Sequence, residues 1–149
     1  RRTVGFENIQ AAIGAAAALR AVLADVEATS AHCRALVTRL RTALVSTIPD
    51  IEVVGDPDDR LPHVLTFSCL YVDGEALVLG LDRRGFSVSS GSACAAESQT
   101  PSHVLAAMGA LTHGNVRVSL TGDATEQTVD ALVAATAETV RLLRAEVGL

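Results

Sequence analysis

The sequence predicts a single α/β domain over residues 1–149, with a small sheet of about three to four strands and helices packed on one face. The length of 149 residues suits one domain, and nearly half of the residues are hydrophobic, enough for a sizeable core. Apolar residues recur every three or four positions near both ends of the chain, a pattern typical of helices. A long helical segment over residues 8–48 is therefore expected to precede the sheet, a loop and a C-terminal helix over residues 51–146.

The first element is predicted to be one long helical segment. Its apolar positions near one face are Ile9, Ile13, Ala16, Leu19, Leu23, Val26, Leu36, Val37, Leu40 and Leu44. Thr29 and Ser30 interrupt this face and predict a kink or a second N-cap. Pro49 ends the segment because its ring cannot continue a helix.

The middle of the chain is predicted to begin the sheet. Residues 51–54 and 64–68 are short apolar runs that favour strands, and the Asp- and Pro-rich residues 55–62 between them favour a loop. A helix is expected over residues 74–83, with Asp73 as its N-cap.

Small and polar residues dominate the next part of the chain. Gly85 is a stop signal for the preceding helix, and residues 86–88 favour a short strand. Residues 89–99 show no periodicity and predict a loop. Pro101 is expected at the first position of a further helix that ends at Gly109.

In the last part of the chain, a stretch of alternating apolar and polar residues is followed by a helical pattern. Residues 115–120 place valines and a leucine on one face of a predicted strand and Arg117 on the other. A final helix is expected over residues 125–144, with Asp123 and Glu126 at the spacing of a capping box.

Composition excludes several classes of protein. The net charge of -5 and the pI near 5.3 argue against nucleic-acid binding, which normally needs a basic face. No apolar run is long enough to predict a membrane span. The chain begins at Arg1 without an initiator methionine, so we expect that its native N-terminus lies further upstream.

Cysteine and lysine usage narrows the chemistry further. Cys33, Cys69 and Cys94 are widely spaced and form no CxxC pair, which argues against a zinc site or a disulfide scaffold and favours the cytoplasm. All twelve basic residues are arginine. Without a lysine amine, this chain cannot form a Schiff base through a side chain.

The strongest candidate for a functional side chain is Cys94, at the end of the SSGSAC run of residues 89–94. Gly91 lets the backbone bend, so the thiol would lie at the tip of a pliable loop. From local composition alone, a functional thiol and an ordinary linker residue are equally supported.

Arg117 is the second candidate for a functional side chain, because a guanidinium on a strand can bind a carboxylate with two hydrogen bonds. From the pattern alone, a solvated surface arginine is the better interpretation.

The remaining polar candidates favour structural roles. Cys33 and Cys69 are predicted to be small buried hydrophobic residues. The histidines, His32, His63, His103 and His113, have no metal-ligand spacing, and His103 is expected at the surface although it follows Cys94 closely enough to assist a thiol. Asp56, Asp58 and Asp59 fit a solvated turn better than a calcium site. No metal is predicted.

Several segments together resemble one family. SSGSAC, followed by PSHVLAAMG, resembles the active-site loop and following helix of the NifS/IscS-type cysteine desulfurases, in the long-loop class. HVLTFSCLYVDGEALVLGLDRRGFSV is similar to the strand, helix and strand that lead into that loop. NVRVSL resembles the strand with a substrate-binding arginine, and DATEQTVDALV resembles the closing helix. The resemblance is in register from about Leu61 onward and is only one of pattern in the N-terminal helix.

The resemblance implies a fold and a reaction. The family consists of fold type I pyridoxal 5'-phosphate (PLP) enzymes, usually homodimers, related to class V aminotransferases. A large domain, absent from this chain, binds PLP on a lysine, and the chain would be the small C-terminal domain. Cys94 matches the nucleophile that takes sulfur from L-cysteine, leaving L-alanine and a persulfide for an acceptor protein in iron–sulfur cluster or thio-cofactor assembly. Arg117 matches the residue that holds the substrate carboxylate.

Two departures and three rival functions accompany this resemblance. Phe6 stands where the family has a threonine that helps hold a PLP phosphate, so no phosphate contact is assigned. Thr121 separates Leu120 from Gly122, where the family usually places glycine directly after leucine.

The expected function is that of one domain of a desulfurase, inactive alone and without covalently bound PLP. The alternatives are a standalone persulfide carrier or interaction module, a class V aminotransferase relative and a selenocysteine lyase.

Overall fold

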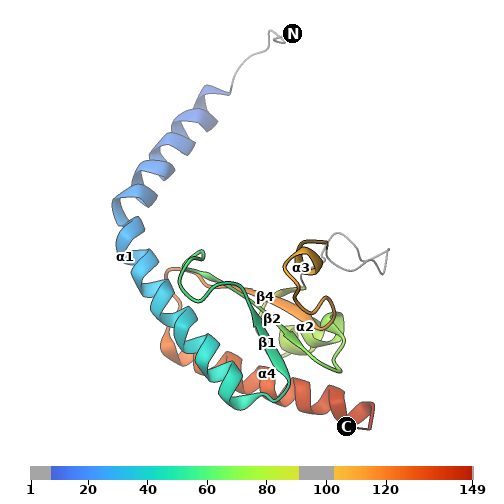
Figure 1. Ribbon diagram of the computed structural model, residues 1–149. Helices are drawn as coiled ribbons and strands as arrows, with labels where there is room; N and C mark the ends of the chain where they lie inside the picture. The colour runs from blue at the N-terminus through green and yellow to red at the C-terminus, as the bar shows by residue number, and fades with distance from the viewer. Residues whose placement is uncertain (1–7, 91–102, 149) are drawn as a thin grey trace, which may run out of the picture.

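The computed structural model describes residues 8–90 and 103–148 of the chain (Figure 1). In chain order its elements are α1 (Ile9–Thr47), β1 (Ile51–Val54), β2 (Val64–Cys69), α2 (Gly74–Asp82), β3 (Ser89–Ser90), α3 (His103–Ala107), β4 (Asn115–Ser119) and α4 (Glu126–Glu146). The Cys94 loop and Phe6 lie outside the described residues.

The four strands form one antiparallel sheet in the order β1-β2-β4-β3. Phe67 at the middle of β2 lies opposite Val53 of β1 and Val116 of β4. Side chains alternate between the two faces of a sheet, so these three residues share one face. Phe67 and Val116 are fully buried there.

Helices cover this apolar face of the sheet. The C-terminal half of α1 packs against α4, β1 and β2 (Figure 1), and α2 packs against α4 and β4. Leu40 of α1, Leu77 of α2 and Val129 of α4 meet Phe67 and other residues of the sheet in a single core cluster. The predicted fold, a small sheet with helices on one face, is confirmed.

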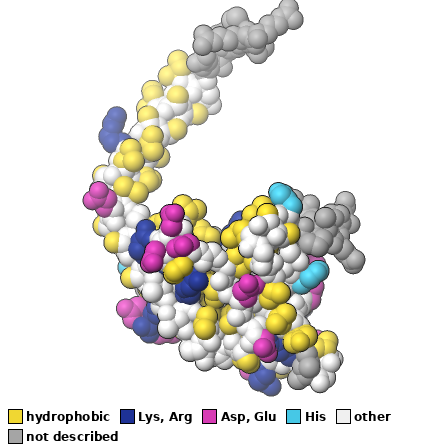
Figure 2. Space-filling model, in the orientation of Figure 1, with side chains coloured by type: hydrophobic (Ala, Val, Ile, Leu, Met, Phe, Trp, Pro, Cys, Tyr) yellow, Lys and Arg dark blue, Asp and Glu magenta, His cyan; other side chains and the backbone are white. Residues whose placement is uncertain are grey.

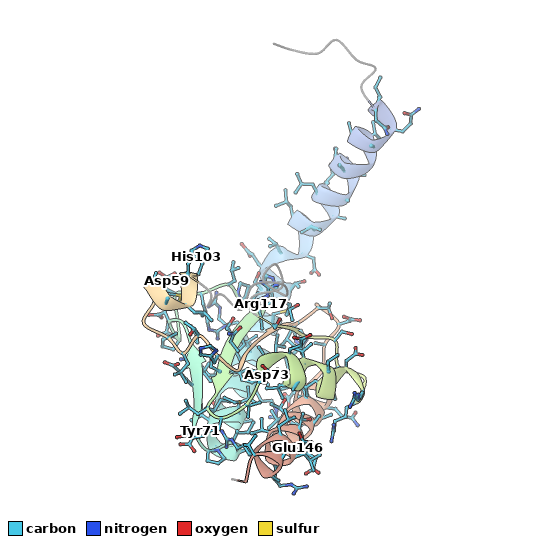
Figure 3. All side chains as sticks on the ribbon, turned by 90° about the vertical axis from the view of Figure 1, so that its right-hand side faces the viewer. Asp59, Tyr71, Asp73, His103, Arg117 and Glu146 are labelled. Atoms are coloured by element: carbon cyan, nitrogen blue, oxygen red, sulfur yellow. The ribbon has the colours of Figure 1, made fainter. Side chains whose placement is uncertain are left out.

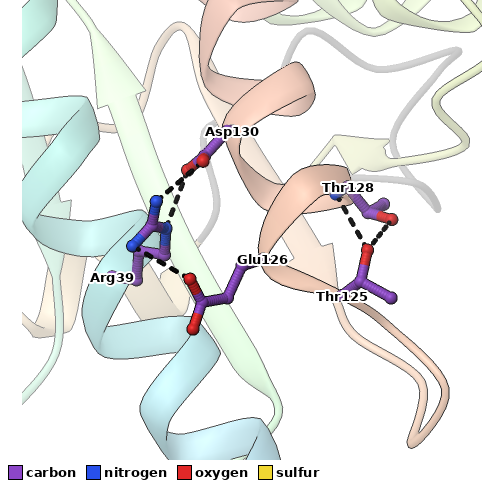
Figure 4. A network of polar contacts seen from close by, with 5 residues as sticks. All are labelled: Arg39, Thr125, Glu126, Thr128 and Asp130. Atoms are coloured by element: carbon purple, nitrogen blue, oxygen red, sulfur yellow. Dashed lines mark hydrogen bonds and ion pairs between the residues drawn. The ribbon is translucent and has the colours of Figure 1, made fainter.

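An ion pair ties the two long helices together at the surface (Figure 4). Arg39 of α1 donates two hydrogen bonds of 2.7 Å to the carboxylate of Asp130 on α4, and its third nitrogen lies 3.3 Å from Glu126. The hydrogen bond and charge of Asp130 raise the pKa of Arg39, and the same hydrogen bond lowers the pKa of Asp130. Because these side chains are exposed, the pair is expected to contribute little to the stability of the fold.

The helix boundaries follow most of the sequence signals. The side chain of Asn8 accepts a hydrogen bond from the Ala11 amide, and that of Asp73 accepts one from the Ala76 amide, so both residues are N-caps. Gly85 ends the turn after α2 with a φ of 85°, in the left-handed region that glycine tolerates. The prediction of a second N-cap at Thr29 and Ser30 is wrong, since α1 is one helix through both residues, and Figure 1 shows this helix bent along its length.

Two further predictions are corrected and one is confirmed. Residues 86–88 form no strand because the Phe86 amide bonds back to Leu81 after α2; the strand is Ser89–Ser90, at the start of the predicted loop. Asp123 does not cap α4, because the Thr125 hydroxyl accepts from the Thr128 amide at 3.1 Å (Figure 4). The predicted end of the next helix at Gly109 is confirmed: α3 spans His103–Ala107, and Gly109, with a φ of 69°, closes its last turn as the Ala110 amide donates to the Leu105 carbonyl.

The N-terminal half of α1 extends away from the body (Figure 1). Every residue from 8 to 28 is exposed. By length and composition alone α1 could cross a membrane, with a mean hydropathy of 1.5 over its most apolar window, so the prediction that no run is long enough is wrong. Core helices of soluble proteins and signal sequences have the same properties, and this finding does not assign a membrane span.

Candidate functional site

Arg117 projects from the sheet face opposite the helices. On β4, Val116 and Val118 are buried while Arg117 between them is exposed. The register places Arg117 directly opposite Thr66 of β2 and Ser89 of β3, and directly opposed side chains on neighbouring strands share one face. In the described part of the chain, no residue accepts a hydrogen bond from the Arg117 guanidinium.

The segment after α3 covers the neighbouring row of the same outer face. The Glu52 carboxylate accepts a 2.8 Å hydrogen bond from the Leu111 amide, and the buried Ser68 hydroxyl donates to the Leu111 carbonyl at 3.1 Å. The Asn115 side chain donates to the Thr112 carbonyl at 2.9 Å. These contacts hold the chain that follows α3 against β1, β2 and β4, next to the row that carries Arg117.

The strand that leads into the Cys94 loop is paired directly with the strand that carries Arg117. Ser89 pairs with Arg117 and Ser90 with Val116. Arg117 therefore lies on β4, and the segment that leads to Cys94 begins on the adjacent strand β3. Cys94 itself lies outside the described residues. Figure 3 shows Arg117 at the end of the body from which α1 departs, with His103 of α3 at the same end.

Sequence reasoning missed Thr66 and Ser89 as neighbours of Arg117. Both are partly buried hydroxyl-bearing residues on the Arg117 face. No local signal could have found them, because the register between β2, β4 and β3 joins residues that are far apart in the sequence.

The two described cysteines are structural. Cys33 is 2% exposed and Cys69 is 1% exposed, as predicted for small buried residues. Burial raises the pKa of the Cys69 thiol to about 11, although the nearby charge of Arg144 opposes this shift. A neutral buried thiol is a poor nucleophile.

Other polar candidates also have structural contacts. A ring nitrogen of His32 lies 2.8 Å from the Ala124 carbonyl, and His103 is exposed at the start of α3. The Asp56 carboxylate accepts hydrogen bonds from the Asp58 and Asp59 amides, which lower its pKa and form the predicted turn. Within residues 8–90 and 103–148, no group of three or more His, Cys, Asp or Glu side chains is arranged to hold a metal ion.

Alignments with known proteins cover almost the whole of this chain but only a part of each known protein. The cysteine desulfurase of Trichormus azollae is 39% identical over 147 residues, which is 97% of this chain and 37% of that protein. The cysteine desulfurase NifS of Azotobacter vinelandii is 37% identical over 135 residues, or 89% of this chain and 34% of that protein. The chain thus spans little more than a third of the length of these relatives.

Solved structures agree with these relatives. A NifS-like protein superposes with a TM-score of 0.79 at 25% identity, over 93% of this chain and 35% of the other. The cysteine desulfurase CsdA of Escherichia coli, in an S-sulfonic acid form, superposes with a TM-score of 0.73 at 26% identity, over 93% of this chain and 32% of the other. The sequence profile of the aminotransferase class-V family matches residues 1–132. The chain therefore belongs to the aminotransferase class-V family.

Proposed function

We propose that this chain is the sulfur-accepting domain of a PLP-dependent cysteine desulfurase, with Cys94 as nucleophile and Arg117 as the carboxylate-binding residue. The observation that carries the proposal is the pairing of β3 with β4, which joins the start of the Cys94 loop to Arg117. The names of the relatives and the SSGSAC motif support the same assignment.

The chain length between β3 and Cys94 is compatible with this role. Cys94 lies four positions after Ser90, so their Cα atoms can lie at most about 14 Å apart. Ser89 and Arg117 are cross-strand neighbours, whose Cα atoms are about 5 Å apart in an antiparallel sheet. A thiol within this reach can contact a small amino acid whose carboxylate is bound by Arg117, and it can also turn toward an acceptor.

The transfer balances without an added oxidant. The bond between the β-carbon and sulfur of L-cysteine breaks as a bond forms between that sulfur and the Cys94 sulfur. The products are L-alanine and a persulfide on Cys94, with the thiol proton of Cys94 formally completing the alanine. Arg117 holds the substrate carboxylate through two charge-assisted hydrogen bonds. The persulfide then passes to an acceptor protein.

Covalently bound PLP does not fit this chain by itself. A Schiff base with PLP needs a side-chain amine, and the sequence has no lysine. We therefore assign the PLP-binding lysine to the remainder of a longer polypeptide and expect residues 1–149 alone to be inactive. Adding PLP to this chain, followed by borohydride, should leave no side-chain adduct inside it.

The complete enzyme is expected to be a cytoplasmic homodimer that supplies sulfur for iron–sulfur clusters or thio-cofactors. These assignments come from the family resemblance. The absence of a CxxC pair and the buried, unpaired state of Cys33 and Cys69 are consistent with a reducing compartment.

The decisive experiment measures sulfide and alanine release from L-cysteine by the complete polypeptide. Cys94→Ser should abolish both products, whereas Cys33→Ala should retain them as a matched control. Sulfide release by Cys94→Ser would remove the nucleophile assignment. Turnover by residues 1–149 alone would contradict the need for a second domain, and a persulfide accepted on Cys94 only from another enzyme would favour a carrier.

The role of Arg117 is tested separately on the same protein. Arg117→Lys keeps the charge but loses the planar fork, and Arg117→Ala loses both. Each should raise KM for L-cysteine by about tenfold or more, because a hydrogen bond to a charged group contributes about 1.5–3 kcal/mol. An unchanged KM in Arg117→Ala would contradict the assignment.

A further inference from the structure

Three arginine side chains gather where α1 meets the loop between β1 and β2. Arg34 and Arg41 lie seven positions apart on α1, so they fall within about 20° of each other around the helix axis. Arg60 comes from the loop itself, residues 55–63. Figure 2 shows basic and acidic side chains side by side where the long helix joins the body. We call Arg34, Arg41 and Arg60 the arginine cluster.

The arginine cluster donates its hydrogen bonds only to neutral oxygens. The acceptors are the backbone carbonyls of Gly55, Pro57, Asp58 and Leu61 and the hydroxyl of Thr38, at 3.0–3.5 Å. Within residues 8–90 and 103–148, no carboxylate oxygen lies within 4.0 Å of these three guanidiniums, whereas Arg39 and Arg141 both form ion pairs. The three positive charges are therefore held close together without a paired negative charge.

Two properties of the arginine cluster indicate a missing anionic acceptor. The Nη1 atom of Arg41 is buried and has no hydrogen-bond partner among the described residues. A buried donor without an acceptor loses its water and gains nothing in exchange, so an ordered ion or water normally satisfies it. Burial lowers the pKa of Arg60, and the positive charges of Arg34 and Arg41 lower it further. A bound anion would relieve both costs.

The aspartates of the same loop do not supply this acceptor, but they restrict the shape of the anion. The Asp56 carboxylate accepts hydrogen bonds from the Asp58 and Asp59 amides of its own loop, at 2.7 and 2.8 Å. Asp58 lies near enough to Arg60 to oppose the fall in its pKa, yet it forms no ion pair there. These negative charges would repel a long polyanion such as nucleic acid along most of its length. A compact anion that contacts the guanidiniums directly avoids most of this repulsion.

We infer that the arginine cluster binds a compact dianion, the phosphoryl group of a small molecule. Such a group carries a charge near -2 and three acceptor oxygens, and the planar fork of a guanidinium can bind two of these oxygens at once. It would give Arg41 Nη1 an acceptor and would offset the repulsion at Arg60. The cluster shares no residue with the candidate site of Cys94 and Arg117, so the inference goes beyond the proposed function and does not depend on it.

Isothermal titration of inorganic phosphate into the complete polypeptide tests the inference without relying on activity. At about pH 8, where a phosphoryl group is almost fully dianionic, phosphate should bind saturably with a sub-millimolar Kd. Sodium chloride at equal ionic strength should give no such signal. Arg34→Gln and Arg60→Gln should each weaken binding by about tenfold or more, because each removes a hydrogen bond between charged groups. Arg83→Gln, which removes an exposed arginine outside the cluster, is the matched control and should leave the Kd unchanged.

A variant with gained affinity separates binding from folding. The Asp58 side chain is exposed and near Arg60, so Asp58→Asn should tighten phosphate binding severalfold, an effect that a poorly folded protein cannot produce. Absence of saturable binding, equal losses in Arg60→Gln and Arg83→Gln, or weaker binding in Asp58→Asn would each overturn the inference. Competition by single-stranded DNA at a lower concentration than phosphate would overturn it in favour of nucleic acid. A phosphoserine peptide that binds more tightly than phosphate and pyrophosphate would overturn it in favour of a protein ligand.

Discussion

Gly80→Ala tests how closely α2 packs on α4. A methyl group built at Gly80 would overlap the side-chain methyl of Thr139, which is only 3% exposed and hydrogen-bonds to the Ala135 carbonyl at 2.7 Å. The hydroxyl is fixed by this bond, so the Thr139 side chain has little freedom to rotate away. One of the two helices must therefore move, or Thr139 must give up its hydrogen bond.

The expected loss follows from two opposing effects. Overpacking a core contact costs about 1–3 kcal/mol, while replacing glycine by alanine inside a helix contributes about 1 kcal/mol of helix propensity. The net effect of Gly80→Ala is a loss of about 1 kcal/mol, within a range of about 0–2. In a domain of this size, 1 kcal/mol corresponds to a fall of about 2–4 °C in the melting temperature.

A double-mutant cycle measured by urea unfolding separates packing from propensity. Thr139→Ser removes the methyl group and keeps the hydroxyl, so alone it costs about 0.5–1.5 kcal/mol for the buried methyl. In the double variant the new methyl at position 80 occupies the vacated space. The double variant should therefore be more stable than the sum of the single changes predicts, by about 1 kcal/mol or more.

Gly14→Ala is the matched control, since a methyl group there meets no atom within 4 Å. It should raise helicity by circular dichroism and leave the core contacts unchanged. Additive losses in the Gly80 and Thr139 cycle, or a stabilising effect of Gly80→Ala alone, would refute the packing argument.

Three further outcomes can be checked on the same chain. Gly114→Ala should destabilise the fold severely, because its φ is 67° and a methyl group would collide with the backbone carbonyls of Cys69 and Val72; urea unfolding measures this. The Cys69 thiol, with its pKa raised to about 11 by burial, should resist iodoacetamide at pH 8.5 until the chain is unfolded, as mass spectrometry would show. Arg39 lowers the pKa of Asp130, so their pair stabilises the fold above the ordinary carboxyl pKa and loses that effect as the pH falls below about 4; the stability difference between wild type and Arg39→Ala should shrink there.

Local patterns predicted much of the secondary structure and the orientation of one site residue. Strict alternation in β4 placed Arg117 on the face opposite two valines, because side chains in a strand point to alternate sides. Asp73 and Gly85 marked the ends of α2 because their preferences act within a few residues. Where two polar residues compete as N-caps, as at Asp123 and Thr125, the choice depends on where the first turn of the helix packs against the core.

By itself, the sequence determined the family motif around Cys94, the absence of a lysine, and the apolar face that runs along α1. Only the tertiary structure decided that β3 pairs with β4 beside Arg117, and that one half of α1 is buried while the other is bare. The reason is physical: periodicity and capping depend on neighbours along the chain, whereas strand register and burial depend on which distant surfaces are packed together.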